Sequence, residues 1–381
     1  MQIPFGRPNI GDDEIAAVTE VLRSGTLVHG EQTHAFEEAF AARIGVRHAI
    51  AVSSCTAGLH LALFARGIGA GHRVVVPAMT HVATAHVVEL QGATPVFVDV
   101  DPSTGNLDVE ALAAVADDGI DAIMPVHYLG LPCDMRAIDD VARKTGAMVI
   151  EDCALAVGAS YDGRSAGSLG ACGSFSFYPV KHMTSIEGGM VTTDDDDLAA
   201  SIRKRRAFGY NRDLTQRTRP GIYDVDVLGF NYRMNEVEAA VGVVQLGKLD
   251  EWLTQRQRNH DVIAEALAGV SGLTVFPTVK GAARSSHYCL NLVLPRDGSV
   301  NRDRVQDCLT ERGIGTSIHY PAAVPMFTYY RERYGYRPGQ FPVAEWLGSQ
   351  TISLPVGPHL GEDGAAVVAA AAVSAISDAL E

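Results

Sequence analysis

One lysine lies in a strand–turn–strand tract that suits covalent chemistry. The tract GSFSFYPVKHMTSIEGGM (173–190) reads as a strand, a proline turn that presents Lys181, and a glycine pair that lets the chain double back into another strand. A lysine at the carboxyl end of a strand, with apolar surroundings, has a lowered pKa and can form a Schiff base. A lone lysine in a turn is more often a solvated surface residue.

Two upstream tracts could complete a site around this lysine. The strand-like VIED (149–152) delivers Asp152 at its end, where a carboxylate could pair with the protonated pyridine nitrogen of pyridoxal phosphate. Asp152 could equally cap a following helix. In VSSCTAGLHLAL (52–63), small hydroxyl residues open an apolar helix whose free N–H groups and dipole suit a phosphate monoester. Each tract alone could have a purely structural role. The presence of all three in one chain favours pyridoxal phosphate chemistry.

The elements that must position these residues follow an α/β pattern. Over the first two thirds of the chain, apolar strand-like runs alternate with amphipathic helical stretches. We therefore expect a mostly parallel sheet with helices on both faces and ligands at the carboxyl ends of its strands. The expected strands are 73–76, 95–98, 122–126, 147–150, 174–177, 189–192 and 288–294, with helices at 134–144 and 302–312, a further helix that ends at Arg203, and a final alanine-rich helix.

The domain organisation is expected to change after an irregular segment. Residues 207–234 show neither helical nor strand periodicity, and a loop of that length is usually functional or lies against a partner. From Asn235 the helical period returns and continues to Leu267, so we expect a helix that bridges two domains. The prediction is a large domain over residues 1–245 and a smaller α+β domain over residues 246–381.

Composition argues against several classes of protein. The 381 residues are 47% hydrophobic, and the formal net charge of −14 repels nucleic acid and anionic membrane surfaces. No uncharged apolar stretch reaches the ~20 residues that a membrane-spanning helix needs. Neither a nucleic acid nor a membrane is therefore expected as a partner.

The chain start and the cysteines predict a cytoplasmic protein. The first residues lack the basic and apolar regions of a signal peptide, and none of the six cysteines forms a C-x-x-C pair. The thirteen histidines include no H-E-x-x-H or comparable cluster, so no metal site is expected.

With these tracts in view, the sequence resembles the DegT/DnrJ/StrS-type sugar aminotransferases, pyridoxal phosphate enzymes of fold type I in the aspartate aminotransferase superfamily. The resemblance covers nearly the whole chain, and its lysine tract is highly specific to the family. It implies a large domain with a mostly parallel central sheet covered by helices, and a smaller C-terminal α+β domain. Besides the Asp152 and Lys181 tracts, the matching tracts are IPFGRP (3–8), EVLRSG (20–25), PAMTHVATA (77–85), VFVDVD (96–101), PVHYLG (125–130), GFNYRMN (229–235), IHYP (318–321) and SLP (353–355).

The resemblance implies roles for individual residues. Lys181 would bind the cofactor covalently and carry a proton between the substrate carbon and the cofactor carbon. Asp152 would bind the pyridine nitrogen, and His81 would stack over the pyridine ring. The cofactor phosphate would be held by side chains and backbone of four residues, Ser176, Thr56, Cys55 and Ala57.

The resemblance also implies a homodimer with shared active sites, because Asn231 would reach the cofactor phosphate of the neighbouring subunit. Arginines of the irregular segment are candidates for a sugar nucleotide's diphosphate, although a solvated loop is an equal interpretation. Further residues could approach the substrate. The arginines are Arg212, Arg217 and Arg219, and the other substrate candidates are His319, Tyr320 and His29.

Three positions depart from the family pattern. Cys55 stands where glycine is common, so the phosphate turn must accommodate a side chain. Leu155 stands where many relatives have glutamine or histidine near the cofactor's phenolic oxygen. His182 follows the lysine where asparagine is common, and we interpret it as a packed turn residue rather than a second acid–base group.

The resemblance implies transfer of an amino group from L-glutamate to a keto-sugar, with a nucleotide-linked 4-keto-6-deoxyhexose as the expected acceptor. The amino-sugar would enter a surface polysaccharide or a glycosylated secondary metabolite. A keto-sugar acid without a nucleotide is an alternative substrate. A sugar dehydratase on the same fold is an alternative enzyme; in such relatives a histidine replaces the lysine, so Lys181 argues against it. A catalytically idle sugar-binding or regulatory homologue would show a damaged lysine, acid or phosphate cradle.

Overall fold

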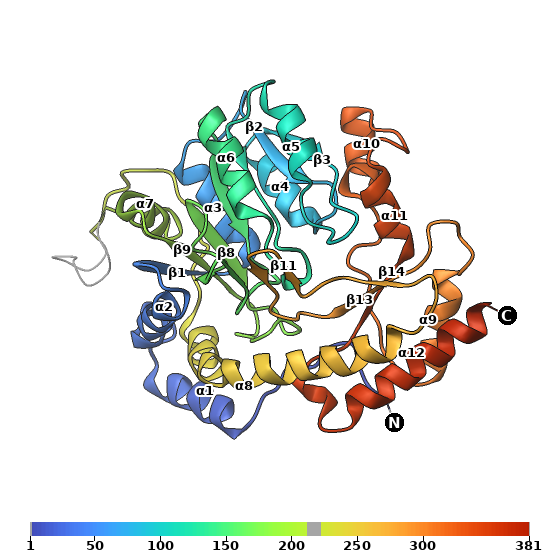
Figure 1. Cartoon of the computed structure of the whole chain (residues 1–381). Coiled ribbons are helices and arrows are strands. Elements are labelled where there is room, and N and C mark those ends of the chain that lie inside the picture. Colours follow the sequence, from blue (N-terminus) through green and yellow to red (C-terminus); the bar gives the residue numbers. More distant parts are fainter. Residues whose placement is uncertain (1, 212–221, 381) are drawn as a thin grey trace.

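The computed structural model describes residues 2–211 and 222–380 and is built around one seven-stranded sheet (Figure 1). Only β9 runs against its neighbours, so the sheet is mostly parallel, as the sequence predicts. The strand order is β1 (His48–Val52), β9 (Gly189–Thr193), β8 (Cys172–Ser176), β5 (Met148–Asp152), β4 (Ala122–Ile123), β2 (Arg73–Pro77) and β3 (Thr94–Val98).

Helices cover both faces of this sheet. Alternating strand residues explain why: Val74 and Val76 of β2 pack into one apolar core, whereas Val75 packs into another on the opposite face. The first face is covered by α3 (Cys55–Ala65), α4 (Val82–Leu90) and α7 (Asp196–Arg205), and the second by α2 (Glu31–Ile44), α5 (Val109–Ala116) and α6 (Met135–Thr145). The expected helices at 134–144 and up to Arg203 are thus confirmed as α6 and α7.

A helix of 32 residues, α8 (Glu236–Leu267), joins the two parts of the molecule (Figure 1). Asn235 caps it, as its side chain accepts a hydrogen bond from the Glu238 N–H at 2.9 Å. Its first half packs on α1 (Asp12–Ser24) and α2, and its second half on α12 (Gly364–Leu380). The helix runs without a break through residue 245, where the sequence places the end of the large domain.

The C-terminal part is an α+β unit. Its antiparallel sheet has the order β10 (Thr274–Val275), β13 (Leu290–Val293) and β14 (Thr351–Leu354). Ile3 pairs with Ile314. The segment before α1, which we call the N-terminal strap, therefore joins the C-terminal unit and not the sheet of the large domain. The remaining elements are β6 (Ser160–Tyr161), β7 (Arg164–Ser165), β11 (Val279–Lys280), β12 (Ala283–Arg284), α9 (Arg302–Glu311), α10 (Thr328–Tyr334) and α11 (Pro342–Gln350).

Two expected strands are shorter than predicted. The strand expected over 122–126 is β4, which ends at Ile123, and beyond it only Val126 forms a bridge, to Asp152. The intervening Pro125 has no N–H to donate to a ladder. The strand expected over 288–294 is β13, at Leu290–Val293.

The irregular segment is confirmed where the structure describes it. Residues 207–211 and 222–234 form isolated bridges, Ala207 with Asn231 and Tyr210 with Val225. Among residues 2–211 and 222–380, no helix combines the length and the apolar character needed to cross a membrane.

We predict that Glu236 stabilises the connection between α8 and α2. Its buried carboxylate accepts hydrogen bonds from the backbone of Gln32 at 2.8 Å and of Thr33 at 3.3 Å, and also from the Thr33 hydroxyl. Glu236→Ala should lower the free energy of unfolding by about 2–3 kcal/mol, because it leaves these donors unpaired. Urea unfolding followed by tryptophan fluorescence measures the loss. Glu251→Ala, at an exposed position of the same helix, should change stability by less than ~0.5 kcal/mol; equal losses in both variants would contradict the role of Glu236.

Candidate active site

Lys181 lies in the turn that follows β8 and is largely buried. Its backbone N–H donates to the Tyr178 carbonyl at 2.9 Å, and its Nζ lies 5.2 Å from the centre of the Tyr288 ring. Burial lowers the pKa of Lys181, while the nearby Cys55 and Asp152 partly oppose that shift. The neutral amine therefore exists at a lower pH than in an exposed lysine, which is what a nucleophilic lysine requires.

Asp152 ends β5 and is 4% exposed. One carboxylate oxygen accepts a hydrogen bond from the Thr84 hydroxyl at 2.7 Å, and the other accepts from the Ala154 N–H at 3.0 Å. Turns follow β5 instead of a helix, so Asp152 is not a helix cap. These donors hold the Asp152 carboxylate near Lys181, and its two oxygens can each accept a further hydrogen bond.

The N-terminus of α3 provides the anion-binding end of the site. Ser54 caps the helix by accepting from the Ala57 N–H at 3.1 Å, so that amide, expected at the phosphate, is already bonded here. The first N–H groups of a helix, here those of Cys55 and Thr56, have no partner within the helix and can bind an anion. Ser176 ends β8 opposite Gly189, and a Cβ at Gly189 would lie only 2.6 Å from the Cys55 nitrogen. Glycine there allows the strand ends to approach the helix.

The Cys55 side chain does not project into this anion-binding end. Its Sγ donates to the Ser174 carbonyl at 3.3 Å and lies 3.8 Å from an Asp152 carboxylate oxygen. Burial raises the pKa of the Cys55 thiol well above its usual value, and the Asp152 charge adds to the effect. The departure from glycine is therefore accommodated by a neutral thiol that is turned toward the sheet.

Two histidines and a tyrosine lie beside the site. His81 directly precedes α4, and His319 and Tyr320 belong to the C-terminal unit. His81 caps α4 through a hydrogen bond from the Ala83 N–H to its Nδ1 at 3.2 Å, and its ring lies 5.7 Å from that of Tyr320. His319 forms a 2.9 Å hydrogen bond through Nδ1 with the Ser353 hydroxyl of β14. Burial lowers the pKa of His319 to about 3, and the proximity of Lys181 and His81 contributes. His81 and His319 both lie near enough to Lys181 to feel its charge, and Tyr320 contacts the rings of both histidines.

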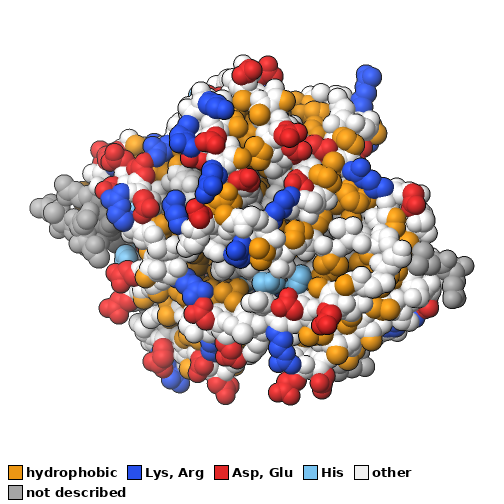
Figure 2. All heavy atoms as spheres, in the orientation of Figure 1, with side chains coloured by type: hydrophobic (Ala, Val, Ile, Leu, Met, Phe, Trp, Pro, Cys, Tyr) orange, Lys and Arg blue, Asp and Glu red, His pale blue; other side chains and the backbone are white. Residues whose placement is uncertain are grey.

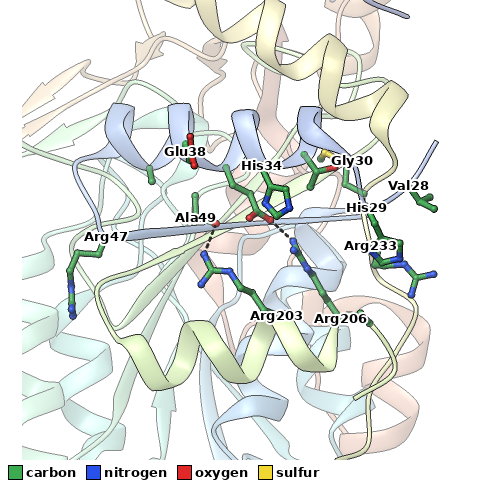
Figure 3. Close-up of a pocket in the computed structure, with 15 residues that line it drawn as sticks. Val28, His29, Gly30, His34, Glu38, Arg47, Ala49, Arg203, Arg206 and Arg233 are labelled. Atoms are coloured by element: carbon green, nitrogen blue, oxygen red, sulfur yellow. Dashed lines mark hydrogen bonds and ion pairs between the residues drawn. The ribbon is translucent and has the colours of Figure 1, made fainter. Parts of the chain in front are cut away.

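Two other candidates lie apart from this cluster. Asn231 is exposed, and its backbone pairs with Ala207. His29 is exposed, has a φ of 58°, and lines a pocket of about 540 Å³ between α2, β1 and α7 (Figure 3). In Figure 3, Arg203 and Arg206 extend from α7 toward β1 and α2, and Arg206 forms an ion pair with Glu37. The expected Arg212, Arg217 and Arg219 lie outside the described residues.

The sequence did not predict several residues that surround Lys181 and Asp152 and hold the neighbouring backbone in place. Thr84 binds Asp152, yet a threonine inside a helical stretch carries no distinctive signal. Glu151 points to the opposite face of β5, where it accepts from His127 Nε2 at 2.9 Å and from three backbone N–H groups. Strand alternation in VIED could have placed Glu151 there. Buried Arg256 of α8 donates to the carbonyls of Tyr288 at 2.9 Å and Lys181 at 3.4 Å, contacts that sequence spacing cannot indicate.

His182 and Leu155 are both buried. His182 is 3% exposed, and its Nε2 lies 3.1 Å from the Ser286 carbonyl, which it can bind only as a donor. This packing agrees with the interpretation of His182 as a turn residue. Leu155 is 1% exposed and belongs to the main apolar core.

These groups fit pyridoxal phosphate. A largely buried lysine, a buried carboxylate with bonded donors, and a helix N-terminus brought close by Gly189 correspond to the cofactor's aldehyde, pyridine nitrogen and phosphate. The fold and the site therefore define a pyridoxal phosphate-dependent transferase of fold type I.

Comparison with known proteins identifies the family. The model of the DegT/DnrJ/EryC1/StrS aminotransferase family matches residues 8–373, so the chain belongs to this family of pyridoxal phosphate-dependent sugar aminotransferases. The spore coat polysaccharide biosynthesis protein SpsC of Bacillus subtilis is 38% identical over 366 residues, which cover 95% of this chain and 94% of SpsC.

Solved structures agree with this assignment. An aminotransferase from Psychrobacter cryohalolentis superposes with a TM-score of 0.92 at 32% identity and full coverage of both chains. The PLP form of Spr1654 from Streptococcus pneumoniae superposes with a TM-score of 0.92 at 25% identity, again with full coverage of both chains.

We predict that Thr84 supports cofactor binding through Asp152. Thr84→Val removes a 2.7 Å hydrogen bond to the carboxylate at nearly constant volume, whereas Thr84→Ser keeps the hydroxyl. The valine variant should bind pyridoxal phosphate roughly tenfold more weakly, because a hydrogen bond to a charged group contributes about 1.5 kcal/mol. Equilibrium dialysis of the cofactor against each variant measures this. Unchanged affinity in Thr84→Val, or equal weakening in Thr84→Ser, would contradict the role of the hydroxyl.

We predict that His182 makes stability depend on pH. Burial lowers its pKa well below 6.5, and the charges of Arg256, Lys181 and His287 also disfavour its protonation. Below pH 6.5 the unfolded chain takes up a proton that the folded chain does not, so this histidine lowers stability as the pH falls, by up to about 1.4 kcal/mol per pH unit.

Replacement by the family's common residue tests this prediction. His182→Asn should reduce the loss of unfolding free energy between pH 7 and about pH 5.5. Urea unfolding of both proteins at the two pH values is the measurement. An unchanged pH dependence in His182→Asn would show that other groups dominate it.

Proposed function

We propose that this sugar aminotransferase transfers an amino group from L-glutamate to a nucleotide-linked 4-keto-6-deoxyhexose. The proposal is supported first by the buried carboxylate that ends β5 and the lysine that follows β8, which fit the cofactor. Lys181 is close enough to Asp152 for the carboxylate to raise the lysine pKa against the effect of burial, and Asp152 is itself buried. An idle homologue would not need to keep a largely buried lysine and a buried carboxylate, which are costly to maintain.

The residues of this chain divide the work of the reaction. Pyridoxal phosphate, when bound, supplies the electron sink that stabilises negative charge at the substrate carbon. Asp152 would hold a proton at the pyridine nitrogen, and the N-terminus of α3 would hold the phosphate. In the first half of the cycle, Lys181 would take a proton at its Nζ from the carbon that bears the amino group of glutamate. In the second half, Nζ would deliver a proton to the carbonyl carbon of the keto-sugar, which becomes the carbon of the new amine.

The surroundings of Lys181 suit these proton transfers. The ring of Tyr288 lies near Nζ, and buried Tyr288 and His319, together with partly buried Tyr320, shield the lysine from water. A lowered lysine pKa raises the fraction of neutral amine at a given pH above that of an exposed lysine, and the neutral amine is the form that accepts a proton.

A sugar as acceptor is supported by the relatives. SpsC is named for spore coat polysaccharide biosynthesis. On that basis, we propose that the amino-sugar made by this chain enters a surface polysaccharide or a glycosylated metabolite. Figure 2 shows acidic and basic side chains interspersed over the visible face, a charge pattern that favours a small-molecule substrate over a nucleic acid.

A second copy of this chain is part of the proposal. Exposed apolar side chains gather in the described parts of the irregular segment, where water contact is unfavourable unless a partner covers them. Asn231 is exposed on the same segment and is thus free to reach a neighbouring subunit's cofactor. The exposed apolar residues there are Phe208, Ile222, Tyr223, Val225 and Leu228.

A cytoplasmic location is proposed from the cysteines. Within the described residues, which include all six cysteines, no disulfide forms, and five of the thiols are buried. Free thiols persist in a reducing compartment.

The dehydratase alternative is not favoured by the site. A dehydratase on this fold would carry a histidine at the lysine position. The adjacent His182 does not substitute for it, because the His182 ring binds the Ser286 carbonyl in a buried position.

The visible absorption spectrum before and after addition of L-glutamate tests the proposed donor and reaction together. The expected result is conversion of the cofactor band to that of pyridoxamine phosphate in the wild type. Lys181→Ala should lose the conversion, because no other residue carries the proton, whereas Lys144→Ala, at an exposed lysine, should convert like the wild type. Persistence of transamination at the wild-type rate in Lys181→Ala would refute the role of Lys181. A cofactor band unmoved by glutamate would refute glutamate as donor.

A further inference from the structure

Three side chains with metal-binding atoms meet where α8 passes the segment before β13 (Figure 1). His260 and Asp261 are consecutive residues of α8, and His287 lies in the segment, shortly before Leu290. One ligand atom from each lies within 4.8 Å of the others, and His260 Nδ1 is 3.6 Å from an Asp261 carboxylate oxygen. Ligands of a tetrahedral zinc ion lie roughly 3.4 Å apart, because each is about 2.0–2.1 Å from the metal. Small side-chain adjustments would therefore complete the geometry.

The buried histidine of this cluster has an unsatisfied nitrogen. His260 is 6% exposed, and its Nδ1 has no hydrogen-bond partner among the described residues. A buried polar atom without a partner is costly, and coordination would satisfy it. The His260 and His287 ring centres are 5.3 Å apart at an interplanar angle of 65°, so both rings can direct a nitrogen toward one point.

The charge state of the two imidazoles is compatible with coordination. Burial lowers the pKa of His260, and burial together with the charge of His260 lowers that of His287 to about 4. The neutral form of an imidazole, which both shifts favour, keeps a lone pair for a metal. Arg256 is the positive group nearby, and its guanidinium is engaged by the carbonyls of Tyr288 and Lys181. The negative charge of the Asp261 carboxylate offsets the positive charge of the Arg256 guanidinium near the two imidazoles.

We propose that His260, Asp261 and His287 bind one divalent transition metal ion, with water completing the coordination. Two imidazoles and one carboxylate suit Zn²⁺, Co²⁺ or Ni²⁺ and not Mg²⁺ or Ca²⁺, which prefer oxygen ligands alone. The Asp261 side chain is 61% exposed, so an ion can enter from solvent and keep a water ligand. No H-E-x-x-H-like motif signals this site, because the fold brings one of its ligands from a different element.

A metal here would stiffen one wall of the active site. It would tie α8 to a segment in which Ser286 binds His182 and Tyr288 contacts Lys181. The ion would act as a structural clamp, and the amino transfer itself would not require it.

Metal titration of the cofactor-loaded enzyme without an affinity tag tests the site. We expect one Zn²⁺ per chain in isothermal titration calorimetry, a higher thermal unfolding midpoint with Zn²⁺, and ligand-field absorption of Co²⁺ that Zn²⁺ abolishes. His287→Asn should weaken Zn²⁺ binding roughly tenfold or more and remove the thermal shift. This variant should still fold, because asparagine tolerates the φ of 55° at that position.

Two further variants separate this site from other metal-binding groups. Asp261→Asn should also weaken binding, because it removes the charged ligand at an exposed position. His72→Asn, which changes a histidine in the turn before β2, should bind Zn²⁺ like the wild type. Absence of Zn²⁺ binding by the wild type, or equal binding by wild type and His287→Asn, would overturn the proposal.

Discussion

The structure depends on keeping the Lys181 amine and the Asp152 carboxylate out of water and close to each other. Burial disfavours the charged form of Lys181, and the neighbouring Asp152 charge restores only part of that loss. The surrounding protein must therefore supply hydrogen bonds and rigid packing. Thr84 and the Ala154 N–H supply them to Asp152, and Arg256 supplies one to the backbone carbonyl of Lys181. The sheet fixes both positions, because Asp152 is the last residue of β5 and Lys181 lies in the turn after β8.

The C-terminal unit and the N-terminal strap complete this environment. Tyr288, His319 and Ser353 belong to the C-terminal unit, and Phe5 of the strap lies 5.4 Å from the His319 ring. Arg256 contacts both parts, since its partners are the carbonyls of Lys181 in the large domain and Tyr288 before β13. The boundary predicted at residue 245 would divide these groups between two domains, yet residues on both sides of it shield Lys181 from water. The site is thus a property of the whole chain.

The sequence predicted those parts of the site whose signal is local. A strand that delivers Asp152, a strand followed by a turn that presents Lys181, and a helix opened by small residues within 52–63 were each predicted from a few neighbouring residues, and β5, β8 and α3 confirm these elements. The supporting contacts could not be predicted, because they join residues far apart in the chain through backbone carbonyls and hydroxyls. Arg256 and Thr84 are examples. Pro125 shows a smaller failure: the apolar run around it predicted a longer strand than its missing N–H allows.

Cys55 illustrates how a departure from a family pattern is absorbed. A side chain at this position could obstruct the anion-binding end of α3, but the first turn of the helix directs it toward β8 and Asp152. There the thiol donates to the Ser174 carbonyl, and the Ser174 hydroxyl donates back to the Cys55 carbonyl at 3.0 Å. A charged or larger side chain would meet the buried carboxylate at this point. The reciprocal bonds therefore restrict position 55 to small neutral residues, and the side chain leaves the first N–H groups of α3 unobstructed.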